Sequence, residues 1–144
     1  MEEEINPEEK IIEEVEEDVL DEIFVDKNIP MNKQLLVDIL KPFITIDNEG
    51  VINFTEDYDK LKDNQKVLIY LASKKAKVAK EILEKDEEAA GPKEISENAG
   101  IGLSSAKVTV SQGFKKFLTK VAGGYIIPNY NLRKIKEIIL KNGN

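Results

Sequence analysis

Several residue types are absent from this 144-residue chain, and each absence removes a class of chemistry. There is no cysteine, histidine or tryptophan, and Arg133 is the only arginine. Without cysteine and histidine, the chain has no disulfides, common structural zinc sites, thiol nucleophiles or Ser-His and Cys-His catalytic pairs. Only carboxylates and other oxygen ligands remain to bind a metal ion. We therefore expect a protein with no metal and no cofactor.

The glycine-rich loops that bind nucleotides are also missing. Gly100-Ile101-Gly102 lacks the third glycine of a dinucleotide-binding loop, because Ser105 occupies that position. The Gly-Lys-Ser or Gly-Lys-Thr sequence of a P-loop does not follow it. The many carboxylate pairs fall in exposed, charged helical runs rather than in an apolar cleft. The sequence therefore predicts that the protein is not an enzyme.

Long apolar runs are absent as well. No run approaches the ~20 residues that a helix needs to cross a membrane. The N-terminus is acidic, which opposes a secretory signal or a transit peptide. We expect a cytoplasmic protein with no membrane partner.

The net charge of −7 conceals two regions of opposite sign. Residues 1–22 contain 12 acidic residues and one lysine, which gives 1 − 12 = −11. Residues 91–144 contain nine basic and three acidic residues, which gives 9 − 3 = +6. Such asymmetry is typical of nucleic-acid contact or of a regulatory tail. Acidity of the whole chain therefore does not exclude nucleic-acid binding.

The acidic start predicts an amphipathic helix over residues 7–25. Pro7 suits the first helical turn, and Asn6 suits the N-cap position. A narrow stripe at helical spacing is typical of a helix that dimerises or docks on a partner, the alternative being an ordinary helix at the edge of the domain. This stripe consists of Ile12, Val15, Val19 and Ile23.

Two helices and a hairpin are predicted in the middle of the chain. Residues 31–40 favour a short helix, and residues 43–54 favour a β-hairpin around a glycine-containing turn. Residues 60–84 predict a longer helix with one apolar side. Lys75 falls within that apolar side, so either its stem snorkels to solvent or the helix bends there.

Residues 92–128 contain the pattern on which the functional hypothesis depends. A short helix is predicted over residues 93–99, and Gly100 ends it in a tight turn. Ile101 is expected to be buried, and a second helix is predicted over residues 104–117. Two short helices joined by such a turn form a helix-turn-helix motif.

Apolar and polar residues divide between two sides of this motif. Ser104 or Ser105 is expected to cap the second helix. The residues expected to pack the two helices together are Ile95, Ile101, Ala106 and Val110. The opposite side is small, hydrogen-bonding and positive, as a helix in the DNA major groove requires. It comprises Ser104, Val108, Ser111, Gln112 and Lys115, with Lys107, Thr109 and Lys116 on the flanks, and Ser105 is a further candidate contact.

Two further elements follow the motif. Residues 118–128 predict a hairpin with a turn at Gly123-Gly124, and residues 131–141 predict a basic helix capped by Asn129 or Asn131. With these features, residues 61–128 resemble a winged helix-turn-helix domain. The elements that carry the resemblance are helices at 64–84 and 93–99, a recognition helix at 104–117 and a wing at 118–128.

The sequence has the core spacing of this family, but it departs from the family's pattern at three points. The core signal is the spacing from Ile95 to Gly100-Ile101. Ser96 replaces the usual alanine, and Ala106 replaces the usual valine. The usual arginines of the recognition helix and wing are missing, which opposes strong guanine readout, because arginine makes that bidentate contact best.

The resemblance implies a mainly α fold with small β-hairpins. An acidic helical region at 1–59 would precede a winged helix-turn-helix domain at 60–144. The implied function is that of a DNA-binding protein, a small transcriptional regulator whose partner is double-stranded DNA, with the acidic helix available for homodimerisation or protein docking. Further phosphate contacts are expected from Lys120, Arg133 and Lys134. The alternative is an adaptor or accessory subunit of a nucleic-acid-processing complex.

Overall fold

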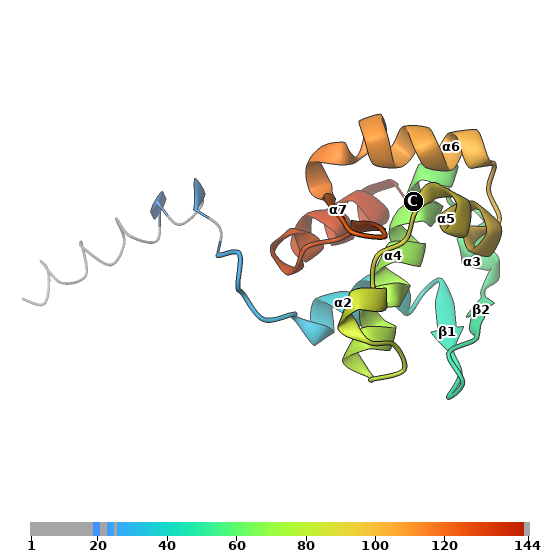
Figure 1. Ribbon diagram of the computed structural model, residues 1–144, viewed down its shortest axis with the longest axis horizontal. Helices are drawn as coiled ribbons and strands as arrows, with labels where there is room; N and C mark the ends of the chain where they lie inside the picture. Colours follow the sequence, from blue (N-terminus) through green and yellow to red (C-terminus); the bar gives the residue numbers. More distant parts are fainter. Residues whose placement is uncertain (1–18, 21–22, 25, 143–144) are drawn as a thin grey trace, which may run out of the picture.

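The computed structural model describes residues 19–20, 23–24 and 26–142 (Figure 1). The described part is mainly helical with two small antiparallel hairpins, which confirms the expected fold class at that level. The predicted helix at 7–25, with Ile12 and Val15, lies almost wholly outside the described residues. The helices are α2 (Lys33–Leu40), α3 (Glu56–Asp59), α4 (Asp63–Ala79), α5 (Pro92–Ala99), α6 (Leu103–Val108) and α7 (Leu132–Asn142).

Both predicted hairpins are present. In the first, β1 (Ile44–Ile46) pairs with β2 (Ile52–Phe54), and its turn is held by Asp47, whose carboxylate accepts hydrogen bonds from two backbone amides. In the second, β3 (Thr119–Val121) pairs with β4 (Gly124–Ile126). The sequence therefore predicted both hairpins correctly, because each combines short β-forming runs with a glycine in the turn.

Helix α4 occupies the centre of the fold. It packs against α2, α5, α6 and α7 (Figure 1). Every residue from Gln65 to Lys75 except Lys66 is buried. Because neighbours cover the helix on almost all sides, its sequence lacks a clean polar face.

Two lysines of α4 are therefore buried and paired. The Lys75 ammonium lies 2.9 Å from the Glu88 carboxylate, and both residues are at most 8% exposed. The Lys74 ammonium lies 2.6 Å from the Glu94 carboxylate. The expectation that Lys75 snorkels or bends the helix is wrong, because a distant carboxylate compensates its charge inside an unbroken helix.

Helix α4 ends five residues before the predicted boundary at residue 84. Glu81 adopts a left-handed φ of 61°, and the amides of Ile82 and Leu83 both bond back to the Lys77 carbonyl. The apolar residues at 82 and 83 extended the helical pattern in the sequence, but they belong to the turn that closes the helix. The helix also begins at Asp63 rather than at residue 60.

Helix α7 and α2 lie against each other and against α4, so the N-terminal and C-terminal parts of the described chain share one core. Leu132, Ile135 and Ile139 are the fully buried residues of α7. Lys136 of α7 lies 3.0 Å from the Asp38 carboxylate of α2. Hydrogen bonds from Gln34 and Lys136 lower the pKa of Asp38. The predicted helix at 131–141 is confirmed to within a residue.

A short bridge joins the second hairpin to the segment that enters α5. Ala90 and Tyr125 exchange two backbone hydrogen bonds, of 3.1 and 2.9 Å. Gly124 has a φ of 139°, and a Cβ placed on it would overlap the Ala90 backbone. The close approach of these two chain segments therefore requires glycine at position 124.

We expect Gly124→Ala to lower the free energy of unfolding by roughly 2–4 kcal/mol, because both the φ value and the overlap with backbone oppose a side chain. Urea unfolding followed by circular dichroism measures this. Gly113→Ala is the control, since the nearest atom to its Cβ would be 3.9 Å away. Equal stability of the two variants would contradict the close approach.

We expect Lys75→Met to cost about 3 kcal/mol or more, because it leaves the Glu88 carboxylate buried without its counter-charge. Lys60→Met is the control, since Lys60 and Asp57 form an exposed pair at 3.5 Å. That exposed pair is expected to contribute less than about 1 kcal/mol. The same urea measurement compares the two variants. Similar losses in the free energy of unfolding would contradict the burial of the Lys75–Glu88 pair.

Candidate nucleic-acid interface

The turn between α5 and α6 has the predicted glycine geometry. Gly100 has a φ of 76°, in the left-handed region, and its amide bonds the Ser96 carbonyl at 3.1 Å. The Ser96 hydroxyl in turn donates to the Ile101 carbonyl at 2.7 Å. Ser96, at a position where the winged-helix pattern that the sequence resembles has alanine, therefore holds the turn with its own hydrogen bond.

The predicted packing of this helix pair is confirmed. The four residues expected to lie between the helices are all buried: Ile95, Ile101, Ala106 and Val110. Helices α5 and α6 pack closely against each other and both contact α4. The outer side of α6 is therefore fixed in place by a buried inner side.

Polar contacts from α4 and α3 fix the ends of α5. The Tyr58 hydroxyl donates to the Ala99 carbonyl at 2.5 Å, at the C-terminal end of α5. Near its N-terminal end, Glu94 accepts from the Tyr70 hydroxyl and from Lys74, both at 2.6 Å. Burial raises the pKa of both tyrosines, and the Glu94 carboxylate adds to the effect at Tyr70.

Helix α6 differs from the predicted recognition helix at both ends. Its N-cap is Gly102, without a side-chain cap bond, so neither Ser104 nor Ser105 is the cap. After Val108 the helix continues as a wide π-turn over Thr109–Gly113 and stops at Phe114, not at residue 117. Two hydroxyl groups in this region bond to the helix backbone: Thr109 donates to the Ser105 carbonyl and Ser111 to the Lys107 carbonyl. Such bonds often bend helices.

Most of the predicted contact residues on this helix lie exposed. Thr109 is the exception to the predicted arrangement, because it is 5% exposed and its hydroxyl bonds within the helix. Ser105 is half-buried. The exposed residues are Ser104, Lys107, Val108, Ser111 and Gln112.

The remaining basic residues lie on other elements. Lys115 and Lys116 are exposed on a separate 3-10 turn, Lys115–Phe117, because α6 has already ended. The Lys116 ammonium lies 5.2 Å from the centre of the Phe117 ring, and Asn131 donates to the Phe117 carbonyl at 3.0 Å. This turn therefore leads from α6 into β3 in a fixed conformation.

Lys120 is exposed on β3, at the start of the second hairpin. Arg133 and Lys134 are exposed on α7, which packs against α2 and α4. The structure therefore groups the contact residues of α6, its following turn and β3 along one continuous stretch of chain. Arg133 and Lys134 belong to a separate element.

Residues at the N-terminal end of α4 lie beside α6, and the sequence pattern does not indicate them as part of the site. An open hollow of about 420 Å³ separates the N-terminal end of α4 from α6. Lys62, Asp63 and Asn64 line it together with Ser104, Ser105, Val108 and Thr109. Lys62 adds a positive charge and Asp63 a negative one. No local pattern could have revealed them, because about 40 residues separate the two walls in the sequence.

Within the described residues, no group of three or more acidic side chains is arranged to bind a metal ion. No helix in that part of the chain has the length and apolar character needed to span a membrane. Comparison of the chain with protein-family models, with curated proteins and with solved structures found no match.

The buried tyrosines predict a loss of stability at alkaline pH. Above the ordinary tyrosine pKa of 10.0, the unfolded chain releases the Tyr58 proton while the folded chain retains it. The free energy of unfolding then falls by about 1.4 kcal/mol per pH unit for this residue. Tyr58→Phe is expected to be less stable at pH 7, because it leaves the Ala99 carbonyl unbonded, but to show a shallower alkaline loss. Urea unfolding between pH 9 and 11.5 measures this, and parallel curves would contradict it.

Proposed function

We propose that this chain is a DNA-binding protein with a winged helix-turn-helix domain, and that it acts as a small transcriptional regulator. In this proposal α6 enters the major groove, and the β3–β4 hairpin contacts the backbone as the wing. The observation that carries the proposal is the exposed side of α6. That side consists of hydrogen-bonding residues and a lysine around the apolar Val108, and the buried inner residues of the helix pair hold it in place.

The order of elements supports this assignment. Helices α4, α5 and α6 are followed by the β3–β4 hairpin, and the bridge between Ala90 and Tyr125 joins that hairpin to the start of α5. A hairpin tied in this way moves with the helix pair rather than independently of it. A helix in the groove and a wing on the adjacent backbone must keep a fixed spacing, which such a tie provides.

The charges of this region support backbone contact more than base readout. Residues 91–144 carry a net charge of +6, with lysines exposed at the end of α6, on the following turn and on β3. Lysine contacts phosphate as a point charge without sequence information. The exposed Ser104, Ser111 and Gln112 side chains can donate to and accept from base edges. We therefore expect a large salt-dependent component of affinity with moderate sequence preference.

Fluorescence anisotropy with a random-sequence duplex tests the proposal on the full chain. We expect micromolar binding at low salt that weakens steeply as salt rises. Lys107→Glu combined with Lys115→Glu should raise the dissociation constant at least tenfold and reduce the salt slope by roughly two. Both side chains are exposed, so circular dichroism should show an unchanged fold.

The matched control combines Lys27→Glu with Lys85→Glu, two exposed lysines outside the proposed interface. It makes the same change in net charge. We expect it to retain most of the affinity and the full salt slope. An equal loss of affinity in both variants would show that only net charge matters. If the unchanged chain does not bind the duplex, the proposal is overturned.

A protein-docking role is the second candidate, and exposed apolar residues favour it. Leu103 and Val108 on α6 and Val121 on β3 are each 39–52% exposed. In that case the chain acts as an adaptor or accessory subunit of a nucleic-acid-processing complex, with the same surface facing a protein. Val108→Ser distinguishes the two, because it removes apolar contact but keeps a groove-compatible residue, so DNA affinity should change less than threefold.

A further inference from the structure

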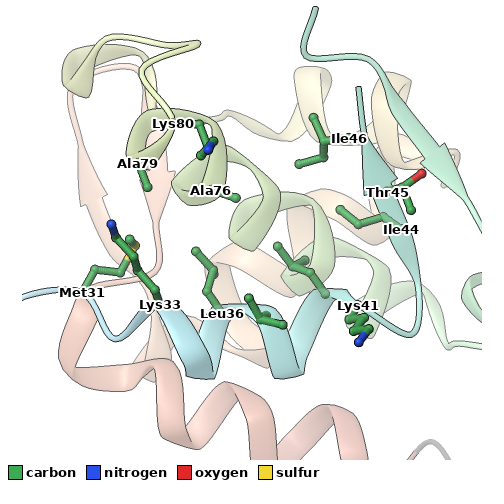
Figure 2. A pocket seen from close by; sticks show the side chains of 12 residues that line it. Met31, Lys33, Leu36, Lys41, Ile44, Thr45, Ile46, Ala76, Ala79 and Lys80 are labelled. Carbon is green, nitrogen blue, oxygen red and sulfur yellow. The ribbon is translucent and has the colours of Figure 1, made fainter. Parts of the chain in front are cut away.

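A second surface, remote from α6, is an apolar groove formed by α2, β1 and the C-terminal part of α4. Figure 2 shows Leu36 extending from α2 toward Ala76 and Ala79 of α4, with Ile44 and Ile46 of β1 along the side. Its volume is about 420 Å³, within the range of sites that bind a ligand or a peptide side chain. Apolar groups therefore line an open site that no other described element fills.

Lysines surround this groove. Lys33, Lys41 and Lys80 line its margin, and the lining contains no acidic residue (Figure 2). All three lysines are exposed, and none pairs with a carboxylate of the described residues. An apolar floor with a positive margin fits an occupant that is apolar on one side and acidic at its flanks.

The chain itself carries a segment of that chemistry. Residues 1–22 have a net charge of −11, and the predicted stripe Ile12, Val15, Val19 and Ile23 is apolar at helical spacing. In its described part, Val19, Leu20, Ile23 and Phe24 are all more than half exposed. The chain thus has an apolar segment and an apolar groove that are both uncovered, with opposite charges around them.

The connection between the segment and the groove is short, and a turn within it is held in place. Asp26 begins a turn in which the Ile29 amide bonds the Asp26 carbonyl at 3.1 Å. The Asn129 side chain holds this turn by donating to the Ile29 carbonyl at 3.1 Å. Two residues later, Met31 itself lines the groove. Seven residues separate Ile23 from Met31, a span of up to ~25 Å, so the segment can reach the groove of its own chain.

We propose that this groove binds the acidic N-terminal segment of the same chain, residues 8–24. The stripe that includes Ile12, Val15, Val19 and Ile23 packs on the groove floor, and the lysine margin faces the flanking carboxylates. A short tether gives a millimolar effective concentration, which favours this occupant over a second copy. Because α2 and β1 lie at the opposite end of the molecule from α6, docking leaves the candidate DNA-binding helix uncovered (Figure 1).

Paramagnetic relaxation enhancement on the full chain tests the proposal. The chain has no cysteine, so Glu17→Cys gives one attachment site for a nitroxide, on the side of the predicted helix opposite the stripe. We expect the amide signals of Val37, Thr45 and Ala79 to lose at least half of their intensity relative to the reduced label. Raising the salt concentration should weaken this effect, because the lysines and carboxylates are exposed.

Two variants locate the docking site. Val37→Asp places a carboxylate in the groove at a side chain that is 47% exposed, and it should restore the lost intensities without unfolding the chain. Val108→Asp is the matched control, because Val108 is 52% exposed but lies on α6. It should leave the broadening at the groove unchanged.

Three outcomes would overturn the proposal. Absence of broadening at the groove would show that the segment does not dock there. Broadening of α6 and the β3–β4 hairpin, lost in Val108→Asp, would place the segment on the basic surface instead. Broadening of an isotope-labelled chain by separate spin-labelled molecules at equal strength would assign the groove to a second copy.

Discussion

The need to neutralise two buried lysines of α4 determines how the rest of the described chain is arranged. Helix α4 is covered on nearly all sides, yet Lys74 and Lys75 lie within its buried part. Both counter-charges come from the chain that follows, Glu88 from the connecting loop and Glu94 from α5. A buried charge without a partner costs several kcal/mol, so the loop must return along α4 instead of leaving it. That return places Ala90 beside Tyr125 and positions α5, on which α6 rests.

The elements that the sequence predicted are those determined by local chemistry. The α5–α6 turn could be predicted because a left-handed residue there requires Gly100, and the hairpins could be predicted from β-forming runs around glycine turns. The boundaries of α4 and α6 could not be predicted in this way. Ile82 and Leu83 continue the helical spacing although they lie beyond the helix, and the last turn of α6 widens into a π-turn over Thr109–Gly113.

Ion pairs between residues far apart in the chain could not be predicted from the sequence either. Lys75 interrupted an apolar pattern, but nothing local indicates that Glu88 compensates it. The hollow between α4 and α6 and the groove between α2 and α4 combine residues about 40 positions apart in the chain. The candidate contact residues were predicted from one helical face, and most of that face is exposed. Thr109 lies buried because it is three residues from the buried Ala106 and so falls on the inner side of the helix.

The bridge between Ala90 and Tyr125 also divides the second hairpin into a part whose length is fixed and a part whose length is free. Gly124 cannot move away from Ala90 without breaking two backbone hydrogen bonds, whereas Ala122 and Gly123 are exposed at the turn. Insertions during divergence would therefore accumulate between Val121 and Gly124, extending the hairpin outward while its base stays in register. The reach of this hairpin along a partner surface could thus change without any change in the helices that support it.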